Sequence, residues 1–137
     1  MNTYILDASV VVRYLLSSSE EVAKRLPLLL RGVKDSKFKL YSSFLLSLEV
    51  CNSLRFSLAD KQKLETVLSK LFKLPIKYLK LTNAQLSEAA SLSYDLGTTV
   101  YDTSYHILAK AHNAIFLTCD EDYYKKAKNL GDIEFIG

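Results

Sequence analysis

Short apolar runs typical of β-strands alternate along this chain with longer segments whose apolar residues recur at helical spacing. Residues 115–117 carry the clearest strand signal, and we expect strands at 3–6, 38–41, 76–81, 115–117 and 133–136. We expect helices at 9–16, 18–33, 43–56, 60–72, 82–97, 103–112 and 121–130. Strands that alternate with helices in this way predict a three-layer α/β fold, in which a central parallel sheet is flanked by helices on both faces.

Capping and breaking residues indicate where several of these helices begin and end. Thr82 and Gln85 have the spacing of a capping box, and Gly97 suits the left-handed conformation that often ends a helix. Ser18, three residues before a glutamate, has the same capping-box spacing at the start of the second helix. Pro27 lies inside that helix, where its missing N–H group predicts a kink or a break.

The composition is that of a folded protein. The chain has 137 residues, of which 49% are hydrophobic, with four glycines and two prolines, so we expect one domain over residues 1–137. No apolar run approaches the roughly 18 residues that cross a bilayer, and Asp7 interrupts the stretch that a signal peptide would need. Cys51 and Cys119 form no CxxC pair, which suits a reducing compartment. We therefore expect a cytoplasmic protein without a membrane segment.

The balance of charge is modest, but its distribution is informative. Eighteen basic and fifteen acidic residues give a formal net charge of +3, which is too small by itself to indicate a nucleic-acid-binding protein. If five acids gather in one pocket, the rest of the molecule keeps 18 basic and 10 acidic residues, a net charge of +8. Those five acids are Asp7, Glu49, Asp102, Asp120 and Asp122. An acidic pocket with a basic surround would follow.

Two of these acids come after predicted strands. Asp7 directly follows the strand at 3–6, and Asp120 lies just past the strand at 115–117. The carboxyl ends of parallel strands meet at one edge of a sheet, and ligands of such sheets bind beyond that edge. The sequence therefore predicts two carboxylates at the ligand-binding edge.

Glu49 lies within the segment FLLSLEVCNSL, which is apolar on nearly every side if it is helical. Burying a carboxylate there is costly unless it is paired or binds a metal ion. Asn52 shares its helix face and is placed to orient the carboxylate or to bind a water or phosphate. The alternative is a partly exposed glutamate on an amphipathic helix.

Each of the other acids also has a structural alternative. Asp7 and Asp102 are suited to cap the helices that follow them. Asp122 suits the first turn of a helix, where a negative charge complements the helix dipole. Thr118 has capping-box spacing with the glutamate three residues later, which would relieve Asp120 of capping. The functional interpretation therefore depends on the coincidence of several acids in otherwise apolar segments.

Carboxylates without a nearby histidine or cysteine pair favour hard cations, so we expect Mg²⁺ or Mn²⁺. Zinc is disfavoured because the cysteines and histidines lack the usual ligand spacing. His106 and His112 are expected at a helix surface or half-buried rather than as general bases. The sequence has no Walker A, GxGxxG or GxSxG motif, which argues against nucleotide cradling and serine hydrolysis.

Four segments together resemble the PIN domain, particularly the small VapC-like toxin ribonucleases: LDASVVVRYL, SLEVCNSLR, VYDTSYHILAKAHNAIFLTCDEDYYKKA and IEFI. The resemblance covers the whole chain, and the third segment is the most specific. It implies a five-stranded parallel sheet and a Mg²⁺- or Mn²⁺-dependent endoribonuclease with RNA as its substrate. It also implies a cognate antitoxin that covers the active site, and a homodimer.

Residue by residue, the resemblance implies catalytic and metal-binding roles for four acids, which are Asp7, Glu49, Asp102 and Asp120. Asp122 matches an accessory acid of many members and is taken as a further metal ligand. Ser9 and Thr118 match small hydroxyl positions that hold the carboxylates by hydrogen bonds. Asn52 and Arg55 match polar positions that often follow the second acid.

Two other functions stay open at this point. The chain is consistent with a PIN-fold nuclease of RNA processing, and with a non-catalytic module that holds RNA or a protein. The apolar residues at 28–30 and 44–48 exceed what a small core must bury, so we expect some of them to face a dimer mate or an antitoxin. The alternative for each of these residues is packing in the core.

Overall fold

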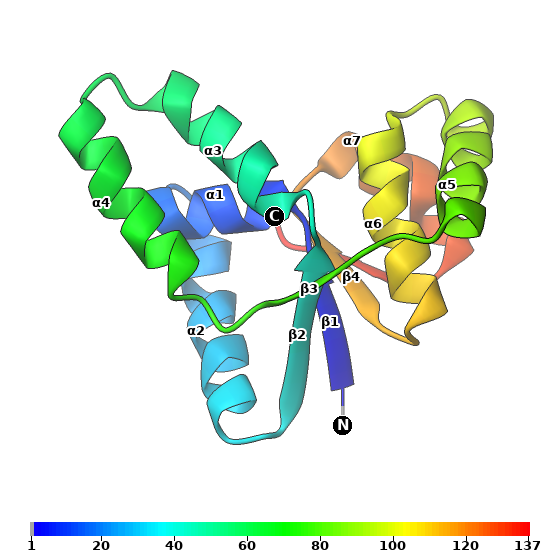
Figure 1. Ribbon diagram of the computed structural model, residues 1–137. Helices are drawn as coiled ribbons and strands as arrows, with labels where there is room; N and C mark the ends of the chain where they lie inside the picture. The colour runs from blue at the N-terminus through cyan, green and yellow to red at the C-terminus, as the bar shows by residue number, and fades with distance from the viewer. Residues whose placement is uncertain (1) are drawn as a thin grey trace.

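The computed structural model describes residues 2–137 and has a five-stranded sheet at its centre (Figure 1). Its strands are β1 (Asn2–Leu6), β2 (Phe38–Ser43), β3 (Lys77–Leu79), β4 (Ile115–Thr118) and β5 (Ile133–Phe135). Their order across the sheet is β3-β2-β1-β4-β5, and every neighbouring pair is parallel. The predicted α/β class and parallel sheet are confirmed.

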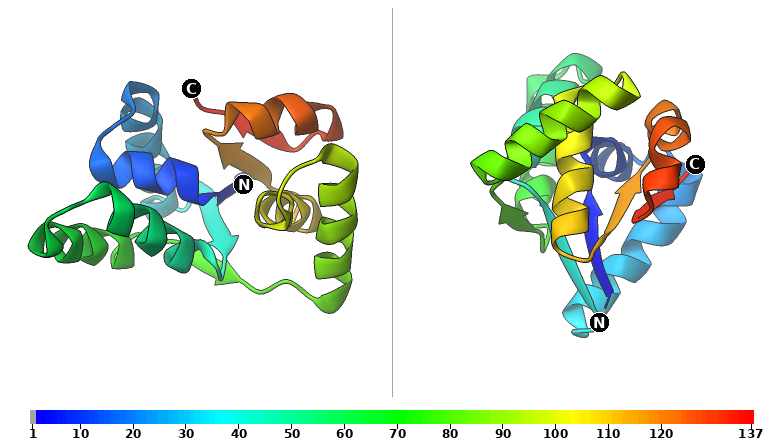
Figure 2. Two further views of the ribbon diagram at one scale, coloured as in Figure 1. Left: turned by 90° about the horizontal axis from the view of Figure 1, so that it is seen from above. Right: turned by 90° about the vertical axis from the view of Figure 1, so that its right-hand side faces the viewer.

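Helices cover both faces of the sheet (Figures 1 and 2). One face is covered by α1 (Ala8–Leu16), α2 (Glu20–Lys34), α3 (Leu46–Ser57) and α4 (Lys61–Phe72). The other is covered by α5 (Asn83–Leu96), α6 (Val100–Ala111) and α7 (Glu121–Ala127), which continues into a 3₁₀ turn at Lys128–Leu130. The chain therefore forms the three layers that the alternating pattern predicts. Within residues 2–137, no helix is long and apolar enough to cross a membrane.

The helix ends agree with the capping signals in part. Thr82 and Gln85 form both hydrogen bonds of the predicted capping box, and Gly97 ends α5 in the left-handed conformation. At the start of α2 the cap is Ser19, whose hydroxyl accepts from the Val22 N–H, and not Ser18. The prediction there was wrong by one residue.

Pro27 does not break α2, which is helical from Glu20 to Lys34. Pro27 and Ala23, whose carbonyl loses its helical partner, are both exposed, so water can bind the freed oxygen. Leu26 and Leu29 on the opposite side of the helix are buried in the core and hold it against the sheet. Packing therefore outweighs the local defect.

His106 is a polar residue that is fully buried in the core. The expectation that it lies at a surface or half-buried was therefore wrong. Its side chain is 0% exposed. One ring nitrogen lies 2.7 Å from the Tyr123 hydroxyl and the other 2.8 Å from the Gly131 carbonyl oxygen. Its ring also packs against Phe116 of β4. His106 is buried because it lies where α6, α7 and β4 meet, whereas His112 is exposed at the end of α6.

The order of the strands reverses between β1 and β4, because the chain builds outward to β2 and β3 on one side and to β5 on the other. Both central strands are covered on each face, and Leu6 and Leu117 at their carboxyl ends are fully buried. Such a reversal point leaves a crevice beyond the carboxyl ends of the two strands. The candidate site lies there.

Candidate active site

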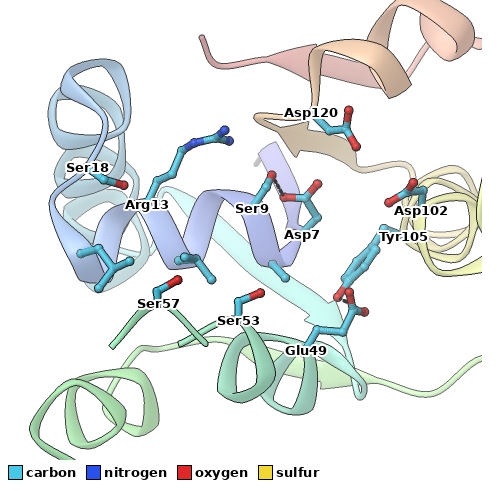
Figure 3. Close-up of a pocket in the computed structure, with 13 residues that line it drawn as sticks. Asp7, Ser9, Arg13, Ser18, Glu49, Ser53, Ser57, Asp102, Tyr105 and Asp120 are labelled. Atoms are coloured by element: carbon cyan, nitrogen blue, oxygen red, sulfur yellow. Dashed lines mark hydrogen bonds between the residues drawn. The ribbon is translucent and has the colours of Figure 1, made fainter. Parts of the chain in front are cut away.

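Four predicted acids line one cavity of about 480 Å³ beyond the carboxyl edge of the sheet (Figure 3). Asp7 follows β1, and Asp120 follows β4 by two residues. Glu49 lies on α3 after β2, and Asp102 lies in the first turn of α6 before β4. Residues from four parts of the chain thus meet at the point where the strand order reverses.

Asp7 is buried, with 6% of its surface exposed, and it accepts three hydrogen bonds. Its Oδ1 atom accepts from the Ser9 hydroxyl at 2.5 Å and from the Val10 N–H at 3.2 Å, which caps α1. Its Oδ2 atom accepts from the Thr118 hydroxyl at 2.6 Å. Burial nevertheless raises the pKa of Asp7 to about 6, because it outweighs these hydrogen bonds. Asp7 therefore caps α1 and also supplies the cavity with a carboxylate whose ionisation is unfavourable.

Ser9 and Thr118 hold Asp7 and also connect the ends of β1 and β4. The Thr118 hydroxyl donates to Asp7 and accepts from the Asp120 N–H at 3.0 Å. The Ser9 hydroxyl donates to Asp7 and accepts from the Cys119 N–H at 3.0 Å. Each hydroxyl therefore bonds the Asp7 carboxylate on one side and the backbone after β4 on the other.

Asp120 caps α7, because its Oδ1 atom accepts from the Tyr123 N–H at 3.0 Å. The expectation that Thr118 would perform this capping was wrong. Thr118 is the last residue of β4, and its hydroxyl is taken up by Asp7 and by the Asp120 N–H. The Oδ2 atom of Asp120 accepts no hydrogen bond from residues 2–137, and the carboxylate lines the cavity.

Asp102 is not the cap of its helix, because α6 begins at Val100 and is capped by Thr99, whose hydroxyl accepts from the Asp102 N–H at 3.2 Å. Its carboxylate lies across the cavity from Asp7 and Asp120 (Figure 3). Burial raises the pKa of Asp102, Thr99 opposes that rise, and the charge of Asp120 adds to it. The cavity therefore resists full ionisation of its acids.

Glu49 is held by a residue that the sequence reasoning missed. The Tyr105 hydroxyl donates to the Glu49 Oε1 atom at 2.8 Å, and the ring of Tyr105 stacks on Phe116 in the core. Burial raises the pKa of Glu49, the Tyr105 hydrogen bond opposes the rise, and the charge of Asp102 adds to it. The pKa of Tyr105 is far above its ordinary value, through burial first and then the charge of Glu49. Tyr105 is therefore a neutral donor, and its position three residues after Asp102 was the available signal.

Asn52 does not line the cavity and is exposed, although it was expected beside Glu49. The positions of α3 that line the cavity with Glu49 are Ser53 and Ser57, four and eight residues further on. Arg55 is also exposed, and its guanidinium lies over the Phe56 ring. The inward face of α3 is thus rotated by one residue from the expected one.

Asp122 lines a second, adjoining cavity of about 680 Å³ rather than the cavity of the four acids. The two cavities share Ser9, Arg13, Ser18 and Asp120 on their linings. Asp122 lies in the exposed first turn of α7, the position in which a negative charge complements the helix dipole. The structure therefore brings four of the five acids together in one cavity and places the fifth in the adjoining cavity.

The chemistry of the lining fits a divalent cation. All four acids supply hard oxygen ligands, and the raised pKa values of Asp7, Glu49 and Asp102 reflect crowded, desolvated charge that a cation would relieve. As placed, no three Asp, Glu, His or Cys side chains of residues 2–137 are close enough to hold one ion directly. Mg²⁺ keeps several of its waters in protein sites. The donor set therefore fits a hydrated Mg²⁺ or Mn²⁺ ion.

Comparison with known proteins gives one family and a set of related folds. The family model described as the PIN domain matches residues 4–129. No curated protein matches the chain significantly by sequence.

Solved structures of toxin–antitoxin systems share the fold over the whole chain. VapBC2 from Rickettsia felis, bound to a DNA fragment from its promoter, is 15% identical with a TM-score of 0.70, and the match covers 98% of this chain and 99% of that one. DNA-bound VapBC from Salmonella typhimurium is 19% identical with a TM-score of 0.68, covering 100% of both chains. A toxin–antitoxin complex from Klebsiella pneumoniae is 12% identical with a TM-score of 0.66, covering 98% of both chains. At such identities the likeness concerns the fold.

Proposed function

The chain belongs to the PIN domain family, and on that premise we propose that it is a metal-dependent endoribonuclease that cuts RNA phosphodiesters as the toxin of a toxin–antitoxin pair. One observation carries the proposal: Asp7, Glu49, Asp102 and Asp120 line a single cavity at the reversal point of the sheet. A binding module has no need of four carboxylates in one cavity, and desolvation raises the pKa of Asp7, Glu49 and Asp102. Metal-assisted hydrolysis does need them.

The four acids have different proposed roles. Asp7, Asp102 and Asp120 would hold one or two Mg²⁺ or Mn²⁺ ions, directly or through water. When bound, such an ion lowers the pKa of a coordinated water and neutralises charge on the phosphate. Glu49, held by the Tyr105 hydroxyl, completes the cage or orients the attacking water. Ser9 and Thr118 fix the Asp7 carboxylate.

Asp122 and Asn52 receive lesser roles in this proposal. Asp122 lies with Asp120 on the lining of the adjoining cavity and would act as an accessory acid toward a second ion. Asn52 is exposed on α3, where it is free to contact RNA outside the cavity.

The proposed partners are a cognate antitoxin and a second copy of this chain, both acting in the cytoplasm. Structures that share this fold have been crystallised as toxin–antitoxin complexes. Leu28, Phe44 and Leu48 are 62%, 48% and 70% exposed, and such apolar surface favours protein contacts. Size-exclusion chromatography of the purified chain, alone and coexpressed with a neighbouring small gene product, tests both partners.

Cleavage of a fluorescent RNA by purified protein tests the activity. The protein is assayed with Mg²⁺, Mn²⁺ or EDTA, beside the variant Asp102→Asn. The matched control is Asp35→Asn, the same change at an exposed residue near the amino ends of the strands. Metal-dependent cutting that is lost in Asp102→Asn and kept in Asp35→Asn supports the proposal. Cutting that survives in Asp102→Asn contradicts it, and tight RNA binding without cutting favours a binding module.

A further inference from the structure

Arg13 is the one basic side chain on the linings of the two adjoining cavities, counted over the part of the chain that the structure describes. It projects from α1 one helical turn beyond Ser9, between Ser18 and Asp120 (Figure 3). The other charged side chains of these linings are acidic: Asp7, Glu49, Asp102, Asp120, Glu121 and Asp122. A polyanion that enters both cavities therefore meets a positive side chain at one place.

The fold leaves one nitrogen of this guanidinium unpaired. The Nη1 atom of Arg13 is shielded from solvent and has no hydrogen-bond partner. Within residues 2–137, Arg13 takes part in no ion pair of 4 Å or less, although acids lie on the same linings. It lies near the Cys119 thiol, which is a weak acceptor. Buried polar atoms are normally paired, so the unpaired Nη1 atom leaves Arg13 able to form a further hydrogen bond with a ligand.

The position of Arg13 suits the backbone of a single nucleic-acid strand. Ser9 contacts Asp7, and Arg13 lies four residues further along α1, which is about 6 Å along the helix axis. That length is close to the separation of successive phosphates in an extended single strand. Arg offers a planar fork of donors that matches phosphate oxygens. The Ser18 hydroxyl, on the same two linings, is a further donor of the kind that binds phosphates.

We propose that Arg13 binds the RNA phosphate adjacent to the one that is cut, so that the strand crosses from the cavity of four acids, past Arg13, into the adjoining cavity. The proposal rests on the proposed nuclease function for the identity of the ligand. Arg13 acts as a substrate-positioning residue, since among residues 2–137 it forms no ion pair with the acids proposed to hold the cation. It selects a bound strand long enough to extend one phosphate beyond the cut.

The first test compares Arg13→Gln with Arg31→Gln, which removes the same charge from an exposed position near the far end of α2. In metal-dependent RNA cleavage, Arg13→Gln should raise KM about tenfold and change kcat less than threefold, because a charge-assisted contact to a non-reacting phosphate is lost. Arg31→Gln should change KM less than twofold. Arg13→Lys, which keeps the charge but not the fork, should fall between the wild type and Arg13→Gln. Equal effects of Arg13→Gln and Arg31→Gln would overturn the proposal.

The second test locates the phosphate. A short single-stranded RNA is prepared as a series in which one phosphate at a time is a neutral methylphosphonate. Binding is measured by fluorescence anisotropy with Asp102→Asn protein in Mg²⁺, with Arg13 retained or changed to Gln. We expect one position at which the neutral linkage weakens binding about tenfold when Arg13 is present and less than twofold when it is absent. Effects that simply add at every position would refute a direct contact.

These binding measurements also separate the two proposals. If the wild type cuts no RNA but the coupled position is found, the nuclease proposal fails and the Arg13 subsite stands as an RNA-binding site. If the wild type cuts and no coupled position exists, the nuclease proposal stands and the subsite fails. The salt dependence gives an independent check, because loss of one phosphate contact should reduce the slope of log affinity against log salt by about 0.7. Thermal unfolding of each variant confirms that the compared proteins are folded.

Discussion

Asp7 in the cavity and His106 in the core are both buried polar groups, but they differ in charge. Asp7 accepts three hydrogen bonds, yet burial still raises its pKa to about 6, so its carboxylate is ionised at neutral pH at a cost. His106 has both ring nitrogens paired, and burial lowers its pKa, so it is neutral. The paired histidine in the core is neutral, whereas the carboxylate that lines the cavity is ionised in spite of its burial.

Asp7→Asn should have the largest effect, because it removes the buried charge from the cavity. The amide keeps the shape of the side chain and its Oδ1 acceptor but removes the charge. We expect cleavage to fall at least about 100-fold, because a proposed ligand of the cation is lost. In EDTA at pH 8 the free energy of unfolding should rise by up to about 3 kcal/mol, since the shift of the Asp7 pKa from 3.8 to about 6 measures the cost of its ionisation. Urea unfolding and RNA cleavage measure the two effects, and lost stability in EDTA would contradict the account.

His106→Leu should have the opposite pattern, with a loss of stability and little change in cleavage. It leaves the Tyr123 hydroxyl and the Gly131 carbonyl oxygen without their partner in the core, which should cost about 2–4 kcal/mol of unfolding free energy. Cleavage per folded molecule should stay within about threefold, because His106 contacts none of the four acids. The control is His112→Gln, on the exposed end of the same helix, which should change stability by less than about 0.5 kcal/mol. Unchanged stability in His106→Leu would show that the two hydrogen bonds contribute little.

The pH dependence of stability should distinguish the two groups by sign. Because the Asp7 pKa is raised, the native state takes up its proton more readily, so stability in EDTA should fall as pH rises from about 4 to about 6. Because the His106 pKa is lowered from 6.5, the unfolded state takes up its proton more readily, so stability should fall as pH drops below about 6.5. Thermal unfolding of Asp7→Asn should therefore show only the acid-side loss from His106 among these two effects. The wild type in Mg²⁺ should lose most of the fall with rising pH.

Tyr105→Phe should have the smallest effect. Tyr105 connects the cavity to the core, and the substitution removes only its hydroxyl. Its ring stays stacked on Phe116, so the free energy of unfolding should change by less than about 1.5 kcal/mol. Glu49 loses its hydrogen-bond donor, so kcat should fall about three- to tenfold. The pH profile of kcat should also shift upward, since that hydrogen bond lowers the Glu49 pKa. An unchanged pH profile would show that Tyr105 does not tune Glu49.

Periodicity was sufficient to predict the order of the elements. It also predicted the sheet edge at which Asp7 and Asp120 lie, because each follows a strand within two residues along the chain. It was not sufficient to show which face of a helix turns inward. Ser53 rather than Asn52 lines the cavity because α3 packs against α1, a contact between distant segments. The burial of His106 and the Tyr105–Glu49 bond likewise depend on how whole helices meet.

The hydrogen bond between Thr118 and Asp7 joins residues 111 positions apart, and that separation matters while the protein is being made. At about 5–20 residues per second, a ribosome adds Thr118 roughly 5 to 20 seconds after Asp7. Asp120, which supplies another acid of the cavity, is added later still. A growing chain therefore carries Asp7 for seconds without the partners that complete the cavity. The proposed activity would therefore appear only after the codon for Asp120 has been translated.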